Sequence, residues 1–411
     1  MDNEEILKRK IKERLNGMIN EMDVEKFLGI LSDKSAYTIF IENIINSMMQ
    51  AERDVYLKSN ENEYANGYFK RTMNTKLDKL DLSVPRTRNC SFRPTLLPEK
   101  YKRTDDSFFD MIKSLILKGN SKNKIISILK SYNNNFSQEL YDEVSNEIKT
   151  RFDDFKSKQL SKRMAFVLID GYVCEMKDEN DEKQKVKKTC IYTIMGVDFE
   201  GNKRILGFYP IFGQENKSDW LKIFHDLVNR GLTDVLMFIS DDFSGISDAI
   251  KAIYSKSLIQ KCYVHLMRNI KKNLAKKDAG DFNYELKQIK ECKEFDEGMK
   301  RFSDLCDKYS TAYKSYMSFL KGKQEEYLCF LRFPMDIRKY IYTTNAVENF
   351  NSLMERARIN NGGYFQSLDS ANKTVFLIVE NMHNNIWKKG NPIIKSYSYE
   401  LEQKYSLTFN S

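Results

Sequence analysis

Three acidic residues lie at positions where a strand or helix begins or ends and where they could take part in catalysis. Asp170 and Asp241 each follow an apolar, strand-like run, and Glu348 lies near the start of a helical pattern. Carboxylates drawn from three distant segments suit the binding of hard divalent cations for phosphoryl transfer. Two such ions about 4 Å apart activate a water or a 3′-hydroxyl and stabilise the leaving oxygen. Because that chemistry needs neighbouring carboxylates, the fold must bring the three segments together.

Each acid also has a purely structural interpretation. Asp170 and the glycine after it, between two strand-like runs, are typical of a type I′ hairpin turn. Asp241 or Asp242 can cap a following helix, although Asp241 lies nearer the end of the strand and is the better candidate ligand. Asn345 and Glu348 have the spacing of a capping box. The residues themselves leave both interpretations open.

Cys262 and His265 invite a zinc assignment. A structural zinc ion needs four ligands, and the remaining cysteines and the two other histidines offer no second pair with suitable spacing. We therefore favour a buried thiol and a hydrogen-bonded imidazole near a sheet.

The elements that must position these residues follow from the hydrophobic pattern. Residues 1–60 have helical spacing, whereas 66–88 interleave basic and β-forming residues. Three short helices are expected in the segment that begins at residue 106, with turns at 119–121 and near Ser137. They fit a helix-turn-helix, and equally a small bundle that joins two domains.

The periodicity changes at residue 164. Helices are expected around 220–228 and from residue 246, and a solvated loop at 177–188. The highly charged residues 266–333 predict an inserted helical domain, and helix dominates again from 345. Strands are expected at 164–169, 189–197, 203–211, 234–240 and 258–264. This order predicts an α/β protein with a mixed sheet covered by helices.

Composition excludes several classes of protein. The seven cysteines are odd in number and form no CxxC pair, which is typical of a reducing compartment. No apolar run approaches the roughly 18 residues that span a bilayer, and the acidic start is not a signal peptide. We expect a soluble cytoplasmic protein. The net charge of +9 permits nucleic-acid binding but does not establish it, since a lysine-rich solvated surface has a similar composition.

Several segments, in order along the chain, resemble the mutator-type transposases of bacterial insertion sequences. The segment 260–269 closely matches the family's Gln-x-Cys-x-x-His-x-x-Arg-Asn signature. In the second catalytic motif of the family, the acid directly after Ser is catalytic, which corresponds to Asp241. The other matching segments are 169–173, 240–245 and 343–351 for the three catalytic motifs, and 66–68 and 84–88 in the amino-terminal half.

The resemblance implies a ribonuclease-H-like mixed-sheet core interrupted by an all-helical insertion and preceded by a largely helical DNA-binding region. In it Asp170, Asp241 and Glu348 form a DDE triad that holds two Mg²⁺ or Mn²⁺ ions, and Cys262 and His265 are a structural signature. The expected parts are 1–100 for DNA binding or oligomerisation, 101–158 resembling a helix-turn-helix, 159–268 and 337–395 for the core, 269–336 for the insertion and 396–411 for a tail.

The resemblance also implies a DNA transposase associated with the bacterial nucleoid. Such an enzyme binds the terminal inverted repeats and target DNA as double strands, cleaves and transfers strands, and works as a homodimer or larger oligomer. No membrane association is expected. The candidate DNA contacts are Arg86, Arg88, Arg268, Asn269, Asn345, Asn351 and Arg356.

The sequence departs from the family pattern at a few positions. Tyr342 and Asn349 replace frequent arginines, and Asp78 replaces a usual glycine. We expect the first two changes to weaken contacts with the DNA backbone, with Arg338 as a possible compensation. They keep two alternatives open: a catalytically decayed or repurposed inverted-repeat-binding repressor, and a nuclease or resolvase without strand transfer.

Overall fold

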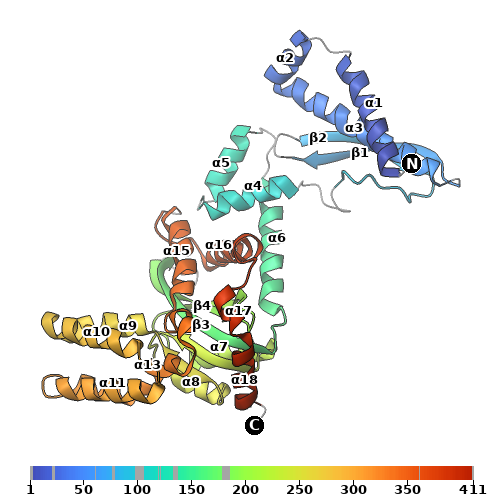
Figure 1. Ribbon diagram of the computed structural model, residues 1–411. Coiled ribbons are helices and arrows are strands. Elements are labelled where there is room, and N and C mark those ends of the chain that lie inside the picture. The colour runs from blue at the N-terminus through green and yellow to red at the C-terminus, as the bar shows by residue number, and fades with distance from the viewer. Residues whose placement is uncertain are drawn as a thin grey trace. The chain divides into compact units, whose positions relative to one another are not determined.

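The chain forms two compact units, Met1–Asn146 and Glu147–Ser411, in the computed structural model (Figure 1). No helix among the described residues is both long and apolar enough to cross a membrane. The structure describes residues 3–20, 24–60, 62–75, 79–97, 106–118, 120, 122–132, 138–177, 186–360 and 362–409.

The first unit combines helices with a two-stranded ribbon. The strands β1 (Ala65–Asn74) and β2 (Lys79–Thr87) are antiparallel and lie in the segment where β-forming residues interleave with basic ones. Apolar side chains of β2 pack on Met49, which belongs to α3. The helices are α1 (Asn3–Asn20), α2 (Val24–Ser32), α3 (Lys34–Lys58), α4 (Asp106–Leu117), α5 (Lys122–Tyr132) and the start of α6 (Gln138–Ser157).

The expected helix-turn-helix corresponds to α4, α5 and α6. Gly119, Ser121 and Ser137, which would form or cap its turns, lie outside the described residues, as does Asp78. The helix-turn-helix therefore stays a prediction.

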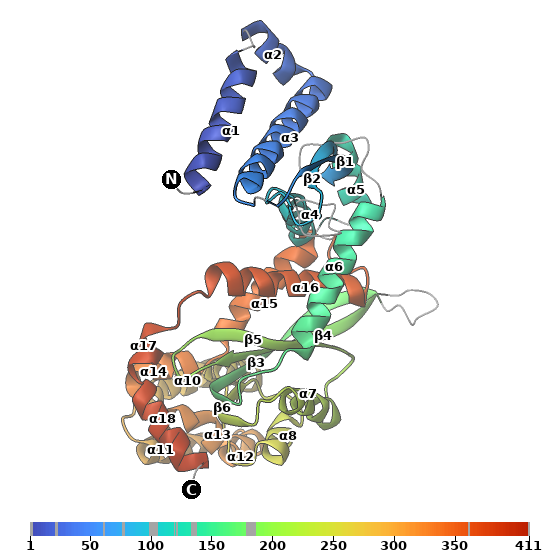
Figure 2. The same cartoon turned by 90° about the vertical axis from the view of Figure 1, so that its right-hand side faces the viewer.

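A mixed five-stranded sheet forms the centre of the second unit (Figure 2). Its order is β5-β4-β3-β6-β7, in which β3, β4 and β5 are antiparallel neighbours while β3, β6 and β7 run parallel. This arrangement confirms the predicted mixed sheet. The strands are β3 (Arg163–Lys177), β4 (Val186–Val197), β5 (Lys203–Phe212), β6 (Asp234–Ser240) and β7 (Leu258–Lys261).

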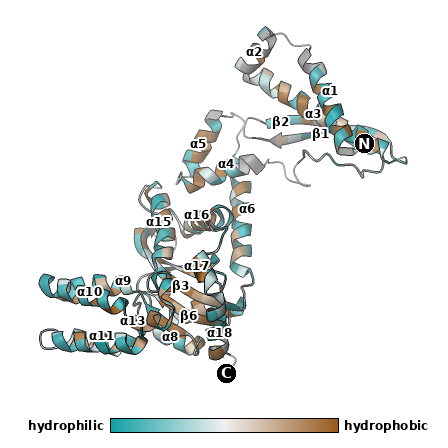
Figure 3. Cartoon of the chain, viewed as in Figure 1, coloured by the Kyte–Doolittle hydropathy of each residue, from teal (hydrophilic) through white to brown (hydrophobic). Residues whose placement is uncertain are grey.

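Helices cover both faces of the sheet because successive side chains of a strand point to opposite faces. Val167 and Ile169 of β3 belong to a core shared with α7 (Lys217–Asn229) and α8 (Ile246–Ile253), which includes the fully buried Trp220. On the opposite face, the ring of Phe166 packs on Phe333 at 5.7 Å between centroids. The hydrophobic colouring of the strands reflects this burial on two sides (Figure 3).

The chain between β7 and α15 (Asn345–Asn360) is helical. The predicted strand 258–264 is too long at its end: β7 stops at Lys261, and α9 begins at Tyr263, whose amide donates to the carbonyl of Tyr342 at 2.7 Å. Helices α10 and α11 are largely hydrophilic (Figure 3). The segment contains α9 (Tyr263–Asn273), α10 (Lys276–Lys290), α11 (Phe295–Tyr309), α12 (Lys314–Gly322), α13 (Gln324–Leu328), the 3₁₀ helix η1 (Cys329–Arg332) and α14 (Met335–Ile341).

The carboxyl-terminal part of the second unit returns to the sheet. Helix α15 packs against β3, and α18 packs against β6. After α15 come α16 (Leu368–Asn381), the π-helical segment η2 (Met382–Ile386), α17 (Pro392–Ser396) and α18 (Ser398–Phe409).

Candidate active site

The parallel pairing of β3 with β6 makes neighbours of the first two acids. Ile169 lies opposite Ser240 in the register, so Asp170 and Asp241 follow at the same place on adjacent strands. Asp170 does not form a hairpin turn. Instead β3 continues to Lys177, with Asp170 paired opposite Thr193 of β4. The turn interpretation is therefore wrong.

Asp170 is the most buried of the three acids. Its side chain is part of a residue only 5% exposed, and its Oδ2 accepts a hydrogen bond from Asn351 Nδ2 at 2.7 Å. Burial first, and then the charges of Asp241 and Glu348, raise its pKa from 3.8 to about 7, while His265 acts in the opposite direction. A buried carboxyl beside two further acids ionises easily only if a cation joins them.

Asp241 and Asp242 have different partners. Asp242 lies 2.7 Å from Lys323 Nζ and 3.3 Å from Lys261 Nζ. Burial opposes its ionisation, but the two lysines outweigh burial and lower the pKa of Asp242. Asp242 therefore compensates a buried lysine, since Lys261 is 1% exposed. Asp241 contacts His265 instead.

Neither aspartate caps the next helix. The N-cap of α8 is Gly245, in the left-handed region at φ 73°, with no side-chain cap hydrogen bond. An alanine there would place its Cβ 2.9 Å from the backbone nitrogen of Lys217. The cap interpretation of Asp241 is therefore wrong, and its carboxylate is available for other contacts.

Glu348 projects from the first turn of α15. Helix α15 begins at Asn345, whose Oδ1 accepts from the Thr343 hydroxyl at 2.8 Å, and Glu348 Oε1 accepts from Arg268 Nη1 at 3.1 Å. The capping-box interpretation is therefore wrong. Glu348 faces the other two acids closely enough to affect the pKa of Asp170. However, ligand atoms of the three acids do not all lie within 4.8 Å of one another in the described chain.

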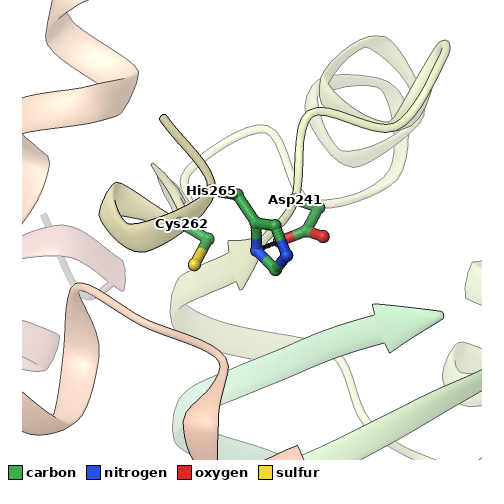
Figure 4. A group of neighbouring side chains, drawn as sticks. All are labelled: Asp241, Cys262 and His265. Carbon is green, nitrogen blue, oxygen red and sulfur yellow. Dashed lines mark ion pairs between the residues drawn. The ribbon is translucent and has the colours of Figure 1, made fainter. Parts of the chain in front are cut away.

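His265 lies beside Asp241, the second acid (Figure 4), and also close to Glu348, the third. Its Nδ1 is 2.5 Å from Asp241 Oδ1, and its Nε2 is 3.9 Å from Glu348 Oε1 and 2.8 Å from Arg268 Nη1. Asp241 and then Cys262 raise the pKa of His265 to about 10. The Arg268 contact opposes a second ring proton, because two N–H groups cannot face each other at 2.8 Å. With Arg268 facing Nε2, the ring carries its single proton on Nδ1, toward Asp241.

The place of His265 was not predicted, although one signal pointed to it. Ser240 lies opposite Lys261 in the parallel pair β6–β7. Residues that follow these two strands must therefore meet at one edge of the sheet. This argument places Asp241 beside the Cys262–His265 segment.

A side-chain network fixes α15 against β3. The Tyr172 hydroxyl donates to Glu355, while Arg358 donates to Glu355 at 2.7 Å and to the Tyr172 oxygen at 3.1 Å. Glu348, Asn351 and Glu355 share one face of α15. The network therefore holds the face that carries the third acid toward the strand that carries the first.

The candidate DNA contacts separate by location. Arg268 is half exposed while it binds Glu348, and Asn269 is half-buried nearby on α9. Asn351 is 8% exposed and donates to Asp170, so we assign it to the site itself. The exposed candidates are Asn345 and Arg356 on α15, and Arg86 and Arg88 in the first unit.

The expected compensation by Arg338 is wrong. Arg338 is 7% exposed, and its guanidinium donates to the carbonyls of Phe333, Cys292, Lys293 and Leu331. Tyr342 packs edge-on against Tyr263 at 6.3 Å between centroids. Both residues therefore have packing roles.

Comparison with known proteins identifies the family of this chain. Residues 19–390 match the family described as Transposase, Mutator family. The chain is 26% identical to the transposase for insertion sequence element IS905 of Lactococcus lactis, over 84% of this chain and 86% of that protein. It is 28% identical to the transposase for ISRM3 of Rhizobium meliloti over 88% of each chain, and 25% identical to that for ISRM5 over 92% and 95%. The chain belongs to the Mutator family of transposases.

Proposed function

We propose that this transposase binds the terminal inverted repeats of an insertion sequence, cleaves the DNA there and joins the freed 3′-hydroxyl to target DNA. Asp170, Asp241 and Glu348 hold two Mg²⁺ or Mn²⁺ ions in a ribonuclease-H-like core. The sheet order supports that core, since three antiparallel strands continue into two parallel ones. The related proteins named above are themselves described as transposases for insertion sequence elements.

One observation carries the proposal. Asp170 and Asp241 stand side by side on adjacent parallel strands, and Glu348 approaches them from α15, which packs on the same strand. Carboxyl ends of adjacent strands are where open α/β sheets place their chemistry. Chance would not bring three acids to that position from such separate segments.

The residues fit hard divalent cations. The donors are carboxylate oxygens, which Mg²⁺ and Mn²⁺ prefer. Asp241 Oδ1 is buried without an aligned hydrogen bond, and burial together with the charges of Asp241 and Glu348 raises the pKa of Asp170, which a bound cation would relieve. The ions would activate a water and then a 3′-hydroxyl, and would stabilise the leaving oxygen.

The remaining side chains orient the acids. Asn351 fixes one oxygen of Asp170, and Arg268 holds Glu348 from the solvent side. The exposed guanidinium of Arg268 can exchange Glu348 for a DNA phosphate. The carboxylates bind ions and do not attack DNA, so we expect no covalent protein–DNA intermediate.

Two element ends must be paired before joining, so we propose that the protein acts as a homodimer or a larger oligomer on DNA. The net charge of +9 is consistent with binding that relies on phosphate contacts. Arg86 and Arg88, exposed in the first unit, are the proposed contacts there.

Isosteric neutral variants test the proposal. We expect Asp170→Asn, Asp241→Asn and Glu348→Gln each to slow end cleavage at least about a hundredfold, because each removes several kcal/mol of metal-dependent stabilisation. Binding of inverted-repeat DNA in EDTA should change less than about twofold. The measurement is a gel assay that resolves nicked from joined DNA, with Mg²⁺ present.

Asp248→Asn is the matched control, since Asp248 is an exposed acid on the neighbouring α8. Near-normal cleavage by a triad variant would remove that residue from the site. DNA binding without any nicking in Mg²⁺ would instead indicate a repressor, and nicking without joined products a nuclease.

A further inference from the structure

A second set of ligand atoms overlaps the acidic site. One atom each from Asp241, Cys262 and His265 lies within 4.8 Å of the other two, a cluster formed from the ends of β6 and β7 (Figure 4). The three donors are a carboxylate, a thiol and an imidazole. This set differs from the three acids, and it suits a softer metal than Mg²⁺.

Two of these ligand atoms form a close, buried pair. Asp241 Oδ1 and His265 Nδ1 are buried without an aligned hydrogen bond, although they lie 2.5 Å apart. Ligand atoms around a tetrahedral zinc ion are about 3 to 4 Å apart, given bond lengths of about 2.0 to 2.3 Å. If the carboxylate and the ring moved about 1 Å further apart, an ion would therefore fit between them.

The surroundings of Cys262 favour its thiolate, the form that binds metal as the third ligand. Cys262 is 1% exposed and occupies the N-cap position of the 11-residue helix α9. The Thr344 hydroxyl donates to its Sγ at 3.6 Å, and the Thr343 hydroxyl lies 3.9 Å from it. A thiolate at this position would face the Thr344 hydroxyl as a donor and the positive end of the helix dipole.

Glu348 completes the surroundings of the histidine. A metal bound at His265 Nδ1 requires the ring proton to lie on Nε2, which is 3.9 Å from Glu348 Oε1. Histidines that bind metals commonly donate their other N–H to a carboxylate. Arg268, half exposed, can turn away to permit this contact.

We propose that Asp241, Cys262 and His265 bind one thiophilic divalent ion of the Zn²⁺ class, with the fourth position open to water or a phosphate oxygen. Because the ion takes Asp241 and engages Glu348 through His265, it excludes the ions of the acidic site. Zn²⁺ is then an inhibitor that competes with Mg²⁺. This second step rests on the proposed function, whereas the binding step does not.

Cobalt substitution tests the binding step, since a Co²⁺–thiolate bond has its own charge-transfer absorption, which carboxylate sites lack. The full chain carries Cys90→Ser to remove the exposed thiol. We expect the band to saturate at one equivalent and to be displaced by Zn²⁺. It should vanish in Cys262→Ser and persist in the matched variant Cys306→Ser, which alters a buried cysteine of α11.

His265→Gln provides a second variant in case Cys262→Ser does not fold. It should lower the affinity for Co²⁺ at least about tenfold, because even the loss of a residue that only hydrogen-bonds to a metal ligand lowers affinity that much. Absence of the band in the parent protein, its survival in Cys262→Ser, or unchanged affinity in folded His265→Gln would overturn the site.

A cleavage assay tests the exclusion. Zn²⁺ should slow Mg²⁺-dependent cleavage in a manner relieved by excess Mg²⁺ or by a chelator selective for zinc. If cleavage is unaltered at Zn²⁺ concentrations that displace the cobalt band, Zn²⁺ does not exclude Mg²⁺. The proposed binding of Zn²⁺ by Asp241, Cys262 and His265 would still stand. Failure of cleavage in Mg²⁺ alone would overturn the proposed function. The cobalt band would still test metal binding, because it does not depend on cleavage.

Discussion

At the scale of the residue, Asp170 is the unfavourable member of the site. It is buried, it faces two other acids, and its carboxyl accepts hydrogen bonds from the Asn351 side chain and the Gly171 backbone. Functional sites commonly store such unfavourable electrostatics, because the ligand that relieves them then binds more tightly. Asp170 therefore links the stability of the protein to pH and to cations.

The sign of the pH effect follows from the raised pKa. Between about pH 4 and pH 7 the folded chain keeps a proton on Asp170 that the unfolded chain releases, so this contribution to stability is lost as the pH rises through about 7. We expect Asp170→Asn to gain stability relative to the parent over that window by a few kcal/mol, since each pKa unit is worth about 1.4 kcal/mol.

Urea unfolding of both proteins in EDTA, at about pH 5 and about pH 8, measures this difference. Added Mg²⁺ should restore the parent at the higher pH and leave Asp170→Asn unchanged. Parallel pH profiles for the two proteins would show that Asp170 is ionised without cost in the folded chain.

At the scale of the element, the segment that carries Asp241 is fixed by its neighbours. It leaves β6, turns at Gly245 and enters α8, with Gly245 against the backbone of Lys217 at the start of α7. Gly245 allows this approach because it has no side chain and accepts a positive φ. The position of the second acid therefore depends on close packing of α7 against the turn.

Two glycines separate packing from backbone strain. Gly245 and Gly213 both have positive φ, 73° and 88°, but a Cβ at Gly213 meets nothing within 4 Å. In both variants the alanine must adopt the left-handed conformation, which lowers the free energy of unfolding by about 1 to 2 kcal/mol. Gly245→Ala should lose about 1 to 3 kcal/mol more, through contact with Lys217. Thermal or urea unfolding compares the two, and equal losses would mean that the turn yields freely.

At the scale of the whole molecule, the chain divides within α6. The carboxyl-terminal half of α6 belongs to the second unit, where the ring of Phe152 packs on Phe208 at 5.4 Å and on Phe376 at 5.8 Å between centroids. The three acids, Cys262 and His265 all lie in this second unit. Recognition of the element ends is expected to depend on the first.

A fragment of residues 138–411 tests this division. It keeps the whole of α6, so we expect it to unfold cooperatively. The fragment lacks Cys90, so its cobalt–thiolate band can be measured without a further substitution. Its affinity for inverted-repeat DNA should fall at least about a hundredfold, toward that for unrelated DNA, because specific binding commonly exceeds non-specific binding by 10³ or more. Retained end affinity would place recognition in the second unit.

The sequence predicted what depends on local pattern and missed what depends on closeness in space. Strand 234–240 was predicted with its observed bounds. Because Asp-Gly is a turn signal, the continuation of β3 past Asp170 is not predictable until β4 is known to pair with it. Arg338 was expected to compensate for Tyr342 because it lies nearby in the sequence, whereas its guanidinium is buried and donates to four backbone carbonyls.

The site shows the same limit. Each acid had a local explanation as good as the functional one. Pairing of β3 with β4 excludes the turn at Asp170, and Gly245 as the N-cap of α8 excludes the cap at Asp241, while pairing of β3 with β6 makes the two aspartates neighbours. The approach of His265 to Asp241 and Glu348 joins three separate elements. Such an approach follows from sheet order, which the hydrophobic pattern does not specify.

The long helical segment before α15 has a consequence for synthesis of the protein. Asp170 and its partner Asn351 are 181 residues apart, and Glu348 is made only after α9–α14. At about 5 to 20 residues per second, roughly 5 to 20 seconds pass between the emergence of the second acid and that of the third. If the three acids form the proposed site, a ribosome-bound chain therefore has its whole amino-terminal unit for all of this time before the site can be complete.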